Sequence, residues 1–335
     1  MCGTSGVREA AYAGGLPTID VIVATRNRPV DLVRLLDALA KQTVRDFRTF
    51  IVDQSDDPSV GSRAVRSLGD DRVVHLPQSG TGKSRALNYA LGHTTATLLL
   101  FTDDDCVPPP DWVATARSAG NRSGIALCFG RVTAHEQHDH GSEFMPVSEF
   151  DERVVLRCGW LRSRPSFGMG ANMCVRRVDL EACGGFDERF GPGSELRAAE
   201  DVELAYRIQR RGGLVSRDPR LWVVHHGGRP LGAVSSQHVA DAYYGIGAVY
   251  GTWARGADVR AVVVTLDEVW QTGKLIAQAV ARRQRPTHLR RLLALMKGLV
   301  DGFLSGKPLV AARRSTKPQR RSIDRLSETR SEPPR

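Results

Sequence analysis

The sequence predicts an α/β fold in which a mostly parallel sheet is covered by helices on both faces. Short apolar runs rich in β-branched residues alternate, through the N-terminal half, with stretches whose apolar residues recur at helical spacing. This alternation is typical of consecutive strand–helix–strand units. The predicted strands are Ile19–Thr25, Phe47–Val52, Arg72–Leu76 and a run that begins at Leu98.

Two helices are predicted between these strands. Pro29 follows the first strand and suits a first helical turn. A later loop, Gly80–Arg85, leads into a second helix through Ala86, Leu87, Ala90 and Leu91. The first helix is supported by apolar residues at i, i+3, i+4 and i+7, namely Leu32, Leu35, Leu36 and Leu39.

The run that begins at Leu98 is apolar without interruption through Phe101 and ends in Asp103, Asp104 and Asp105. Three adjacent carboxylates repel one another, so a positive group is expected among them. Hard oxygen ligands at the end of a strand suit Mg²⁺ or Mn²⁺ carrying a phosphorylated substrate. The alternative is an acidic turn, because prolines follow and Asp is common in turns.

Polar residues follow each predicted strand, and parallel strands present their carboxyl ends at one edge of the sheet. A nucleoside diphosphate fits such an edge: a carboxylate and a hydroxyl contact base and ribose, cations face the phosphates, and a metal bridges them. The segments expected at this edge are Thr25–Arg28, Asp53–Asp57, Gly80–Arg85 and Asp103–Asp105.

The segment Gly82-Lys83-Ser84 does not form an ATPase P-loop, because that motif needs a glycine where this chain has Pro77. Lys83 and Arg85 nevertheless begin a predicted helix, where the helix dipole disfavours cations. A bound anion would compensate them; the alternative is a solvated helix start.

Composition narrows the class of protein. The 335 residues are 41% hydrophobic, enough to bury a full core, and carry a formal net charge of +10. The basic residues lack the interleaved aromatics of a nucleic-acid surface, so we expect anionic substrates or an anionic membrane surface instead. Six separated cysteines favour a reducing cytosol, and we expect no signal peptide and no membrane-spanning helix.

Several motifs recur together in one order, and with them the chain resembles the family 2 glycosyltransferases, inverting enzymes that use nucleotide-diphospho-sugar donors. The resemblance covers roughly residues 19–228. It is carried by IDVIVATRNRP (19–29), IVDQSDD (51–57), SGTGKSRALN (79–88), TDDDC (102–106), GMGANMCVRR (168–177), GGFDERFG (184–191) and EDVELAYRIQRRG (200–212).

The resemblance implies a GT-A fold, a Rossmann-type α/β/α sandwich whose central sheet is mixed, and a divalent metal, Mg²⁺ or Mn²⁺. It implies that Asp53 contacts the nucleobase and that Asp103 and Asp105 form the Asp-x-Asp element, with Asp105 the direct ligand. UDP is the default nucleotide, and the acceptor is a hydroxyl compound. The remaining donor-binding candidates are Thr25, Arg26, Arg28, Lys83, Arg85, Asp104, Gly170 and Asn172.

Glu200 and Asp201 open a predicted helix. Acids at a helix start have a structural explanation, since they complement the dipole. The family pattern instead makes Asp201 the general base, with Glu200 beside it. His225 and His226, after the strand Leu221–Val224, complete the metal site, bind phosphate, or serve as ordinary surface histidines.

Two other groups have simpler interpretations. His135, His138 and His140 lie in a polar stretch that favours an exposed loop over a metal site. Trp160 stacks on a sugar or packs as an ordinary half-buried tryptophan.

Beyond residue 228 three helices are predicted over Val239–Tyr250, Val259–Val280 and Leu289–Leu304. The apolar side of the last packs on the catalytic domain or on a second subunit, or lies on a membrane surface, since arginines cluster beside it. The expected organisation is a flexible leader (1–16), a GT-A domain (17–230), a helical extension (231–311) and a disordered basic tail (312–335). We expect a cytoplasmic protein, placed at the inner membrane face if the surface alternative holds.

The sequence leaves two competing functions. A nucleotidyltransferase would share the sheet and the metal, but it normally has a glycine-rich basic loop after the first strand, and Ala24–Pro29 has no glycine. A nucleotide-sugar-binding protein without activity would be expected to lack the base, whereas Asp201 is present.

Overall fold

The structure is a computed structural model that describes residues 18–136, 138–139, 141–156, 167–283 and 288–306. The predicted leader (1–16) and tail (312–335), His140 and Trp160 fall outside the described residues.

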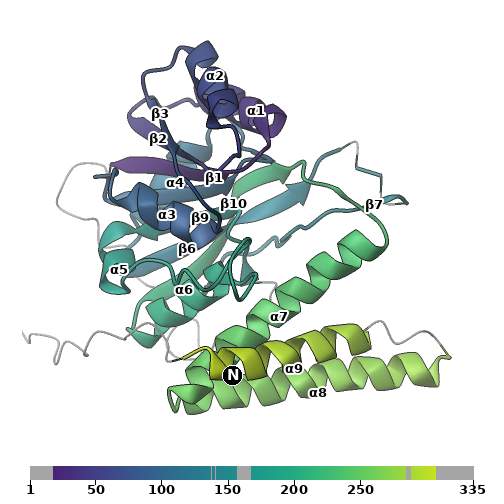
Figure 1. Ribbon diagram of the computed structural model, residues 1–335. Coiled ribbons are helices and arrows are strands. Elements are labelled where there is room, and N and C mark those ends of the chain that lie inside the picture. The colour runs from purple at the N-terminus through teal and green to yellow at the C-terminus, as the bar shows by residue number, and fades with distance from the viewer. Residues whose placement is uncertain (1–17, 137, 140, 157–166, 284–287, 307–335) are drawn as a thin grey trace, which may run out of the picture.

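A nine-stranded mixed sheet forms the centre of the molecule (Figure 1). Its first four strands are parallel in the order β3-β2-β1-β4, and β9 then pairs antiparallel with both β4 and β6. β10 runs parallel to β6 and antiparallel to β5 and β8. The strands are β1 (Ile19–Thr25), β2 (Phe47–Asp53), β3 (Val73–Pro77), β4 (Leu98–Asp103), β5 (Cys106–Val107), β6 (Ile125–Ala134), β8 (Val154–Leu156), β9 (Asn172–Arg176) and β10 (Leu214–His225).

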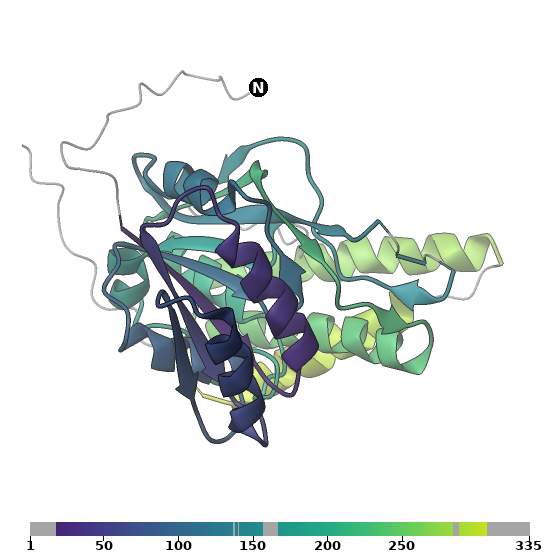
Figure 2. The same ribbon diagram turned by 90° about the horizontal axis from the view of Figure 1, so that it is seen from above.

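Helices cover both faces of the sheet, as predicted. Side chains of β1 alternate between them: Val21 and Val23 enter one apolar cluster and Ile22 the other. The first cluster is covered by α1 (Pro29–Ala40), α2 (Pro58–Leu68) and α4 (Trp112–Gly120), and the second by α3 (Lys83–Leu91), α5 (Arg177–Ala182) and α6 (Glu200–Arg210). Figure 2 shows α1 and α2 side by side.

The predicted first helix is present, with Pro29 in its first turn and its four leucines buried. The helix α2 was not predicted. Asp57 caps it by accepting a hydrogen bond from the Ser59 backbone N–H at 3.0 Å. Only Gly61 and Val65 are buried on it, so few apolar residues mark this helix in the sequence. The helix α4 and the strand β6 were likewise not predicted.

Three longer helices follow a small two-stranded sheet, β7 (Glu143–Phe144) with β11 (Arg229–Pro230). They are α7 (Ala233–Arg255), α8 (Val259–Ala281) and α9 (His288–Leu304), and each overlaps a helix predicted from the sequence. A third apolar cluster joins them to the loop before α6 through Phe190 and Leu196. Among the described residues, no helix is both long enough and apolar enough to cross a membrane.

Candidate active site

A cavity of about 490 Å³ lies where β1 and β4 end. α6 contributes its first residues to the wall, and α7 contributes His238, Ala242 and Ile246. Segments far apart in the chain therefore meet at one edge of the sheet, as the sequence predicts. The predicted site residues that line this cavity are Thr25, Arg26, Arg28, Lys83, Asp103, Asp104, Asp105, Gly170, Glu200, Asp201 and His225.

The three acids after β4 have different partners, so their mutual repulsion is relieved. Asp103 Oδ1 lies 2.5 Å from Lys83 Nζ. Asp104 accepts hydrogen bonds from the Thr25 hydroxyl at 2.7 Å and from Arg28 at 3.1 Å. Burial raises the pKa of Asp104 to about 6 although these two donors oppose the rise. The hydrogen bonds from Thr25 and Arg28 therefore fix the Asp104 side chain within the turn.

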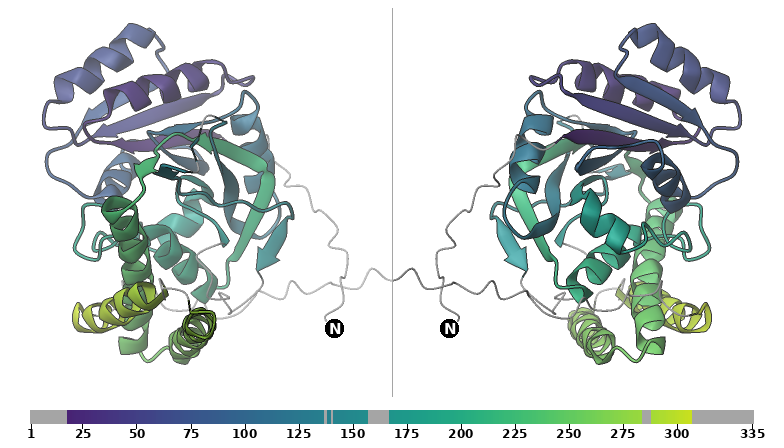
Figure 3. Two further views of the ribbon diagram at one scale, coloured as in Figure 1. Left: turned by 90° about the vertical axis from the view of Figure 1, so that its right-hand side faces the viewer. Right: turned by 90° about the vertical axis from the view of Figure 1, so that its left-hand side faces the viewer.

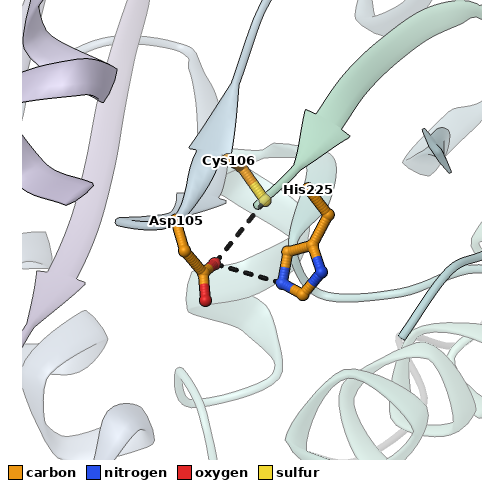
Figure 4. Close-up of side chains that lie close together, drawn as sticks. All are labelled: Asp105, Cys106 and His225. Atoms are coloured by element: carbon orange, nitrogen blue, oxygen red, sulfur yellow. Dashed lines mark hydrogen bonds and ion pairs between the residues drawn. The ribbon is translucent and has the colours of Figure 1, made fainter. Parts of the chain in front are cut away.

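Asp105 lies against His225, which ends β10 (Figure 4). Its Oδ1 is 3.2 Å from His225 Nε2, and its Oδ2 accepts a hydrogen bond from Arg28 Nη1 at 2.7 Å. Burial alone would raise the pKa of Asp105, but the hydrogen bond and charge of His225, together with Arg28, hold it well below its usual range. Asp105 is an ionised acceptor in this arrangement.

The Asp105–His225 pair fits a divalent metal. Two ligand atoms on adjacent corners of an octahedron with ~2.1 Å bonds lie roughly 3 Å apart, close to the 3.2 Å seen here. His225 Nδ1 lies 3.1 Å from Met145 Sδ, so the ring can present Nε2 to an ion. Gly227 leaves room at Asp105, because a Cβ there would meet Oδ2 at 2.2 Å.

Cys106 also lies near this pair, its sulfur 3.9 Å from Asp105 Oδ1. Burial raises the pKa of the Cys106 thiol well above its ordinary value. A protonated thiol is a poor metal ligand, so the fit depends on the carboxylate and the imidazole.

Lys83 joins the acidic turn to the start of α6. Its Nζ is 2.5 Å from Asp103 Oδ1 and 3.3 Å from Glu200 Oε1. Burial alone would lower the pKa of Lys83, but the charges of Asp103 and Glu200 more than offset it and the pKa is raised. The ammonium is therefore charged and centred between two carboxylates at the cavity wall. Its backbone N–H donates to the Pro192 carbonyl, which fixes the loop before α6 against α3.

Asp201 is held by two backbone donors. Its Oδ2 accepts a hydrogen bond from the Gly170 N–H at 2.6 Å, and its Oδ1 accepts one from the Val202 N–H at 2.7 Å. Burial raises the pKa of Asp201 while Lys83 and the backbone donors oppose it. Gly170 has to be small, since a Cβ there would lie 3.2 Å from the Asp201 Cβ. The carboxylate is oriented at the cavity wall with a raised proton affinity.

Asp53, predicted to contact a nucleobase, lies beside the main cavity in a smaller one of about 120 Å³. Its Oδ2 is 3.0 Å from His75 Nε2, and its Oδ1 accepts a hydrogen bond from the Ser55 N–H at 2.9 Å. α2 packs directly on it, since a Cβ on Gly61 would meet Asp53 Oδ2 at 2.1 Å. Thr25 and Arg28 line both cavities, so the two are adjacent.

Besides Asp53, three predicted residues lie outside the main cavity lining. Asn172 is fully buried, accepting a hydrogen bond from Trp112 Nε1 at 3.0 Å and donating to the Arg131 and Leu221 carbonyls. Arg85 is exposed on α3, and His226 stacks on His135 with ring centroids 5.0 Å apart. Their predicted roles have no geometric support.

Two residues that were not predicted as site residues also line the cavity. Arg229 on β11 donates a hydrogen bond to the Gly227 carbonyl at 3.2 Å and lies near Asp105 and Arg28. His238 on α7 lines the opposite wall, and burial lowers its pKa to about 4. Each is an isolated residue without a motif around it, so spacing gave no signal for either.

The predicted exposed histidine loop is more ordered than its composition suggests. His138 Nδ1 lies 3.5 Å from Glu143 Oε2, and the His135 ring is 6.0 Å from the His138 ring. These three side chains bring ligand atoms close together on the far side of the His226–Gly228 turn from Asp105.

Comparison with known proteins bears on this arrangement. Residues 20–150 match the family described as Glycosyl transferase family 2. Validoxylamine A glucosyltransferase of Streptomyces hygroscopicus subsp. jinggangensis is 30% identical over 234 residues, which cover 59% of this chain and 52% of that protein. Over residues 20–150 the chain is therefore similar to glycosyltransferase family 2.

A second relative extends the similarity to a larger share of this chain. The O-antigen biosynthesis protein RfbC of Myxococcus xanthus is 26% identical over 232 residues, covering 63% of this chain and 17% of RfbC. The aligned region thus spans about half the length of the glucosyltransferase and less of RfbC.

Similarity to solved structures shows that this chain has the GT-A fold. The mannosyltransferase PcManGT from Pyrobaculum calidifontis, in complex with GDP-Man and Mn²⁺, superimposes with a TM-score of 0.59 at 17% identity and covers 90% of this chain and 91% of its own. S. aureus TarS 1–349 in complex with UDP-GlcNAc gives a TM-score of 0.50 at 18% identity, covering 70% and 66%. The predicted fold is therefore confirmed.

Proposed function

We propose that this chain is an inverting glycosyltransferase that moves a sugar from a nucleotide-diphospho-sugar to an acceptor hydroxyl, assisted by Mn²⁺ or Mg²⁺. One observation carries the proposal: Lys83 bridges Asp103 and Glu200, so the acidic turn and the start of α6 with Asp201 line one cavity. A diphosphate at the turn and a hydroxyl at Asp201 would then face the same sugar.

In this proposal each residue has a role that its contacts permit. Asp105 and His225 would hold the metal, which would supply positive charge at the diphosphate. Arg28 and Arg229 flank Asp105 and contribute fixed positive charge to the same phosphates. Asp53 lines the adjacent cavity, where we place the base. Lys83 lies between Asp103 and Glu200 and holds both carboxylates in place.

Asp201 accepts the proton of the acceptor hydroxyl as its oxygen attacks the anomeric carbon. The bond between that carbon and the phosphate oxygen breaks, and its electron pair leaves with the nucleoside diphosphate. Because a single displacement occurs opposite the leaving group, the anomeric configuration inverts. The raised pKa of Asp201 strengthens it as a base.

Two solved structures of similar fold suggest candidate donors. One contains GDP-Man with Mn²⁺ and the other contains UDP-GlcNAc. UDP stays the default, with GDP next. A nucleotidyltransferase is less well supported, since the β1–α1 loop lacks the glycines of that class. A nucleotide-sugar-binding protein without activity would bind the same donor, so only a measurement of sugar transfer distinguishes it from an enzyme.

The test is a thermal-shift screen of nucleotide-sugars with and without Mn²⁺ or Mg²⁺. One donor is expected to raise Tm in a metal-dependent way, and Asp105→Ala to remove that metal dependence. The stabilising donor is then incubated with candidate acceptors, and NMR assigns the anomeric configuration of the product. Retention of configuration, or no shift with any nucleotide-sugar, would overturn the proposal.

A further inference from the structure

The helices α8 and α9 lie at the edge of the molecule, on the side of α7 away from the sheet (Figures 1 and 3). Both expose large apolar side chains. On α8 the exposed side chains are spaced at i, i+3, i+4, i+7 and i+11, and on α9 at i, i+4, i+7, i+11 and i+14, so each set forms one stripe. The stripes comprise Val259, Val262, Val263, Leu266 and Trp270 on α8, and Leu289, Leu293, Met296, Val300 and Phe303 on α9.

The two stripes join across a groove of about 370 Å³ between the helices. Its wall is apolar and includes Leu266 from α8 with Val300 and Phe303 from α9. Trp270 is 66% exposed and Leu266 63% exposed, which is unusual for such large apolar side chains gathered on one surface.

This face is not the one that attaches α9 to the protein. α9 packs on α7 through glycines: a Cβ on Gly298 would lie 1.9 Å from the Tyr244 carbonyl oxygen, and one on Gly302 2.2 Å from the Ala248 carbonyl oxygen. Leu295, which is fully buried, lies on the same side as these glycines. The exposed stripe is opposite, and the residues that the structure describes leave it uncovered.

Basic residues outnumber acidic ones in the part of the chain that carries the apolar face and in the part that follows it. Residues 259–304 contain eight Lys or Arg against three Asp or Glu, and residues 307–335 add nine against three. Lys274 lies one turn after Trp270, with its Nζ 5.9 Å from the indole centroid. Lys297 lies one turn after Leu293 and is 63% exposed. Long cationic side chains at the border of an apolar stripe can reach anionic headgroups while the stripe enters the acyl boundary.

We propose that the α8–α9 face binds the surface of an anionic phospholipid bilayer. The charge distribution favours this occupant over a second copy, because a two-fold interface places the same patch against itself. In such a dimer, the basic side chains beside the apolar stripe of one copy would face those of the other and repel them. An anionic lipid surface instead attracts each cation near it.

Vesicle co-sedimentation of the full chain tests the proposal. Binding is expected to vesicles of phosphatidylcholine with phosphatidylglycerol, and to be at least about tenfold weaker to phosphatidylcholine alone and at high salt. Leu266→Gln with Val300→Gln is expected to abolish it. The matched control is Val30→Gln with Val178→Gln, which removes valines that are 70% and 65% exposed on α1 and α5 and should leave binding intact.

Trp270 gives a second readout that does not depend on sedimentation. Its emission is expected to shift to shorter wavelength with anionic vesicles, and the shift should disappear in Trp270→Phe. Equal binding to neutral and anionic vesicles would overturn the charge argument. The absence of vesicle binding by a folded wild type would overturn the proposal. A dimer in sedimentation velocity that Leu266→Gln with Val300→Gln converts to a monomer would also overturn it, because it would assign the face to a second copy.

Discussion

Gly227 and Asp105 are in direct contact: a Cβ on Gly227 would lie 2.2 Å from Asp105 Oδ2. The glycine follows the proposed ligand His225 by two residues, so the turn after β10 reaches the acidic turn only because this position has no side chain. In the same turn, the His226 backbone N–H donates a hydrogen bond to the Asp105 backbone carbonyl oxygen at 2.8 Å.

Gly227→Ala should therefore displace the Asp105 carboxylate without removing either proposed ligand. We expect metal-supported nucleotide binding to weaken about 10–100-fold, the range found when residues behind metal ligands are changed. Calorimetry with UDP or GDP, in the presence and absence of Mn²⁺, measures this. Gly92→Ala, at a helix end with only ordinary contacts, is the control. Unchanged affinity in Gly227→Ala would separate Asp105 from the metal.

Asp201→Asn removes the base and keeps one of the two backbone hydrogen bonds, because the amide has a single acceptor oxygen. We expect kcat to fall about 10²–10⁴-fold with donor Kd unchanged, because the side chain acts on the acceptor proton rather than on the nucleotide. Product release from the donor identified by thermal shift is the assay. Asp179→Asn, an acid in the first turn of α5, controls for loss of a helix-start charge. Wild-type turnover in Asp201→Asn would exclude it as the base.

The sequence predicted what depends on local pattern. The leucine stripe of α1 and the apolar strand before Asp103 follow from residue spacing, and the edge where parallel strands end follows from their alternation with helices. The position of β9 does not: an antiparallel strand between β4 and β6 is a matter of long-range pairing. Residues brought in by that pairing, such as Asn172, were placed in the site by motif but lie in the core.

The same limit applies to single side chains. Lys83 was noticed because a cation opens a helix, and its partner Asp103 because it belongs to a cluster. Arg229 and His238 belong to no cluster in the sequence and meet only because β11 and α7 fold beside β10. Residues of this kind are found from tertiary structure rather than from composition or spacing.

Asp218 makes stability depend on pH at the strand that carries His225. Its carboxylate accepts hydrogen bonds from Arg122 at 2.7 Å and from Arg220 at 2.8 Å beside the β10 bulge. Burial would raise the pKa of Asp218, but these arginines lower it to about 2. Because the folded pKa is below the unfolded value, the stabilisation is present above about pH 4 and is lost as pH falls toward about 2.

Asp218→Asn should cost about 1–2 kcal/mol near neutral pH, allowing for the solvent exposure of Arg220. The gap to wild type should close as pH approaches the folded pKa. Urea unfolding at several pH values measures both. Asp151→Asn, whose side chain is 97% exposed, should show no such gap. A gap that persists at low pH would mean that the loss comes from packing rather than from charge.

Gly298 sets how closely α9 approaches α7. A Cβ there would lie 1.9 Å from the Tyr244 carbonyl oxygen and 3.0 Å from the Ala248 N, both backbone atoms that cannot turn aside as a side chain can. Gly298→Ala should therefore push the helices apart and strain the hydrogen bond from the Tyr244 hydroxyl to Asp301 at 2.7 Å. We expect unfolding free energy to fall by about 1–3 kcal/mol, as in other overpacked interfaces.

Gly273→Ala is the matched control for that change, because Gly273 also lies within a helix of the C-terminal region but has no heavy atom near its Cβ position. It should be neutral or slightly stabilising, since Ala is the better helix former. Thermal unfolding followed by circular dichroism compares the two. If Gly298→Ala behaved like Gly273→Ala, α7 and α9 would have to lie farther apart than their backbone contacts indicate, and the apolar stripe of α9 would no longer be fixed toward the outside.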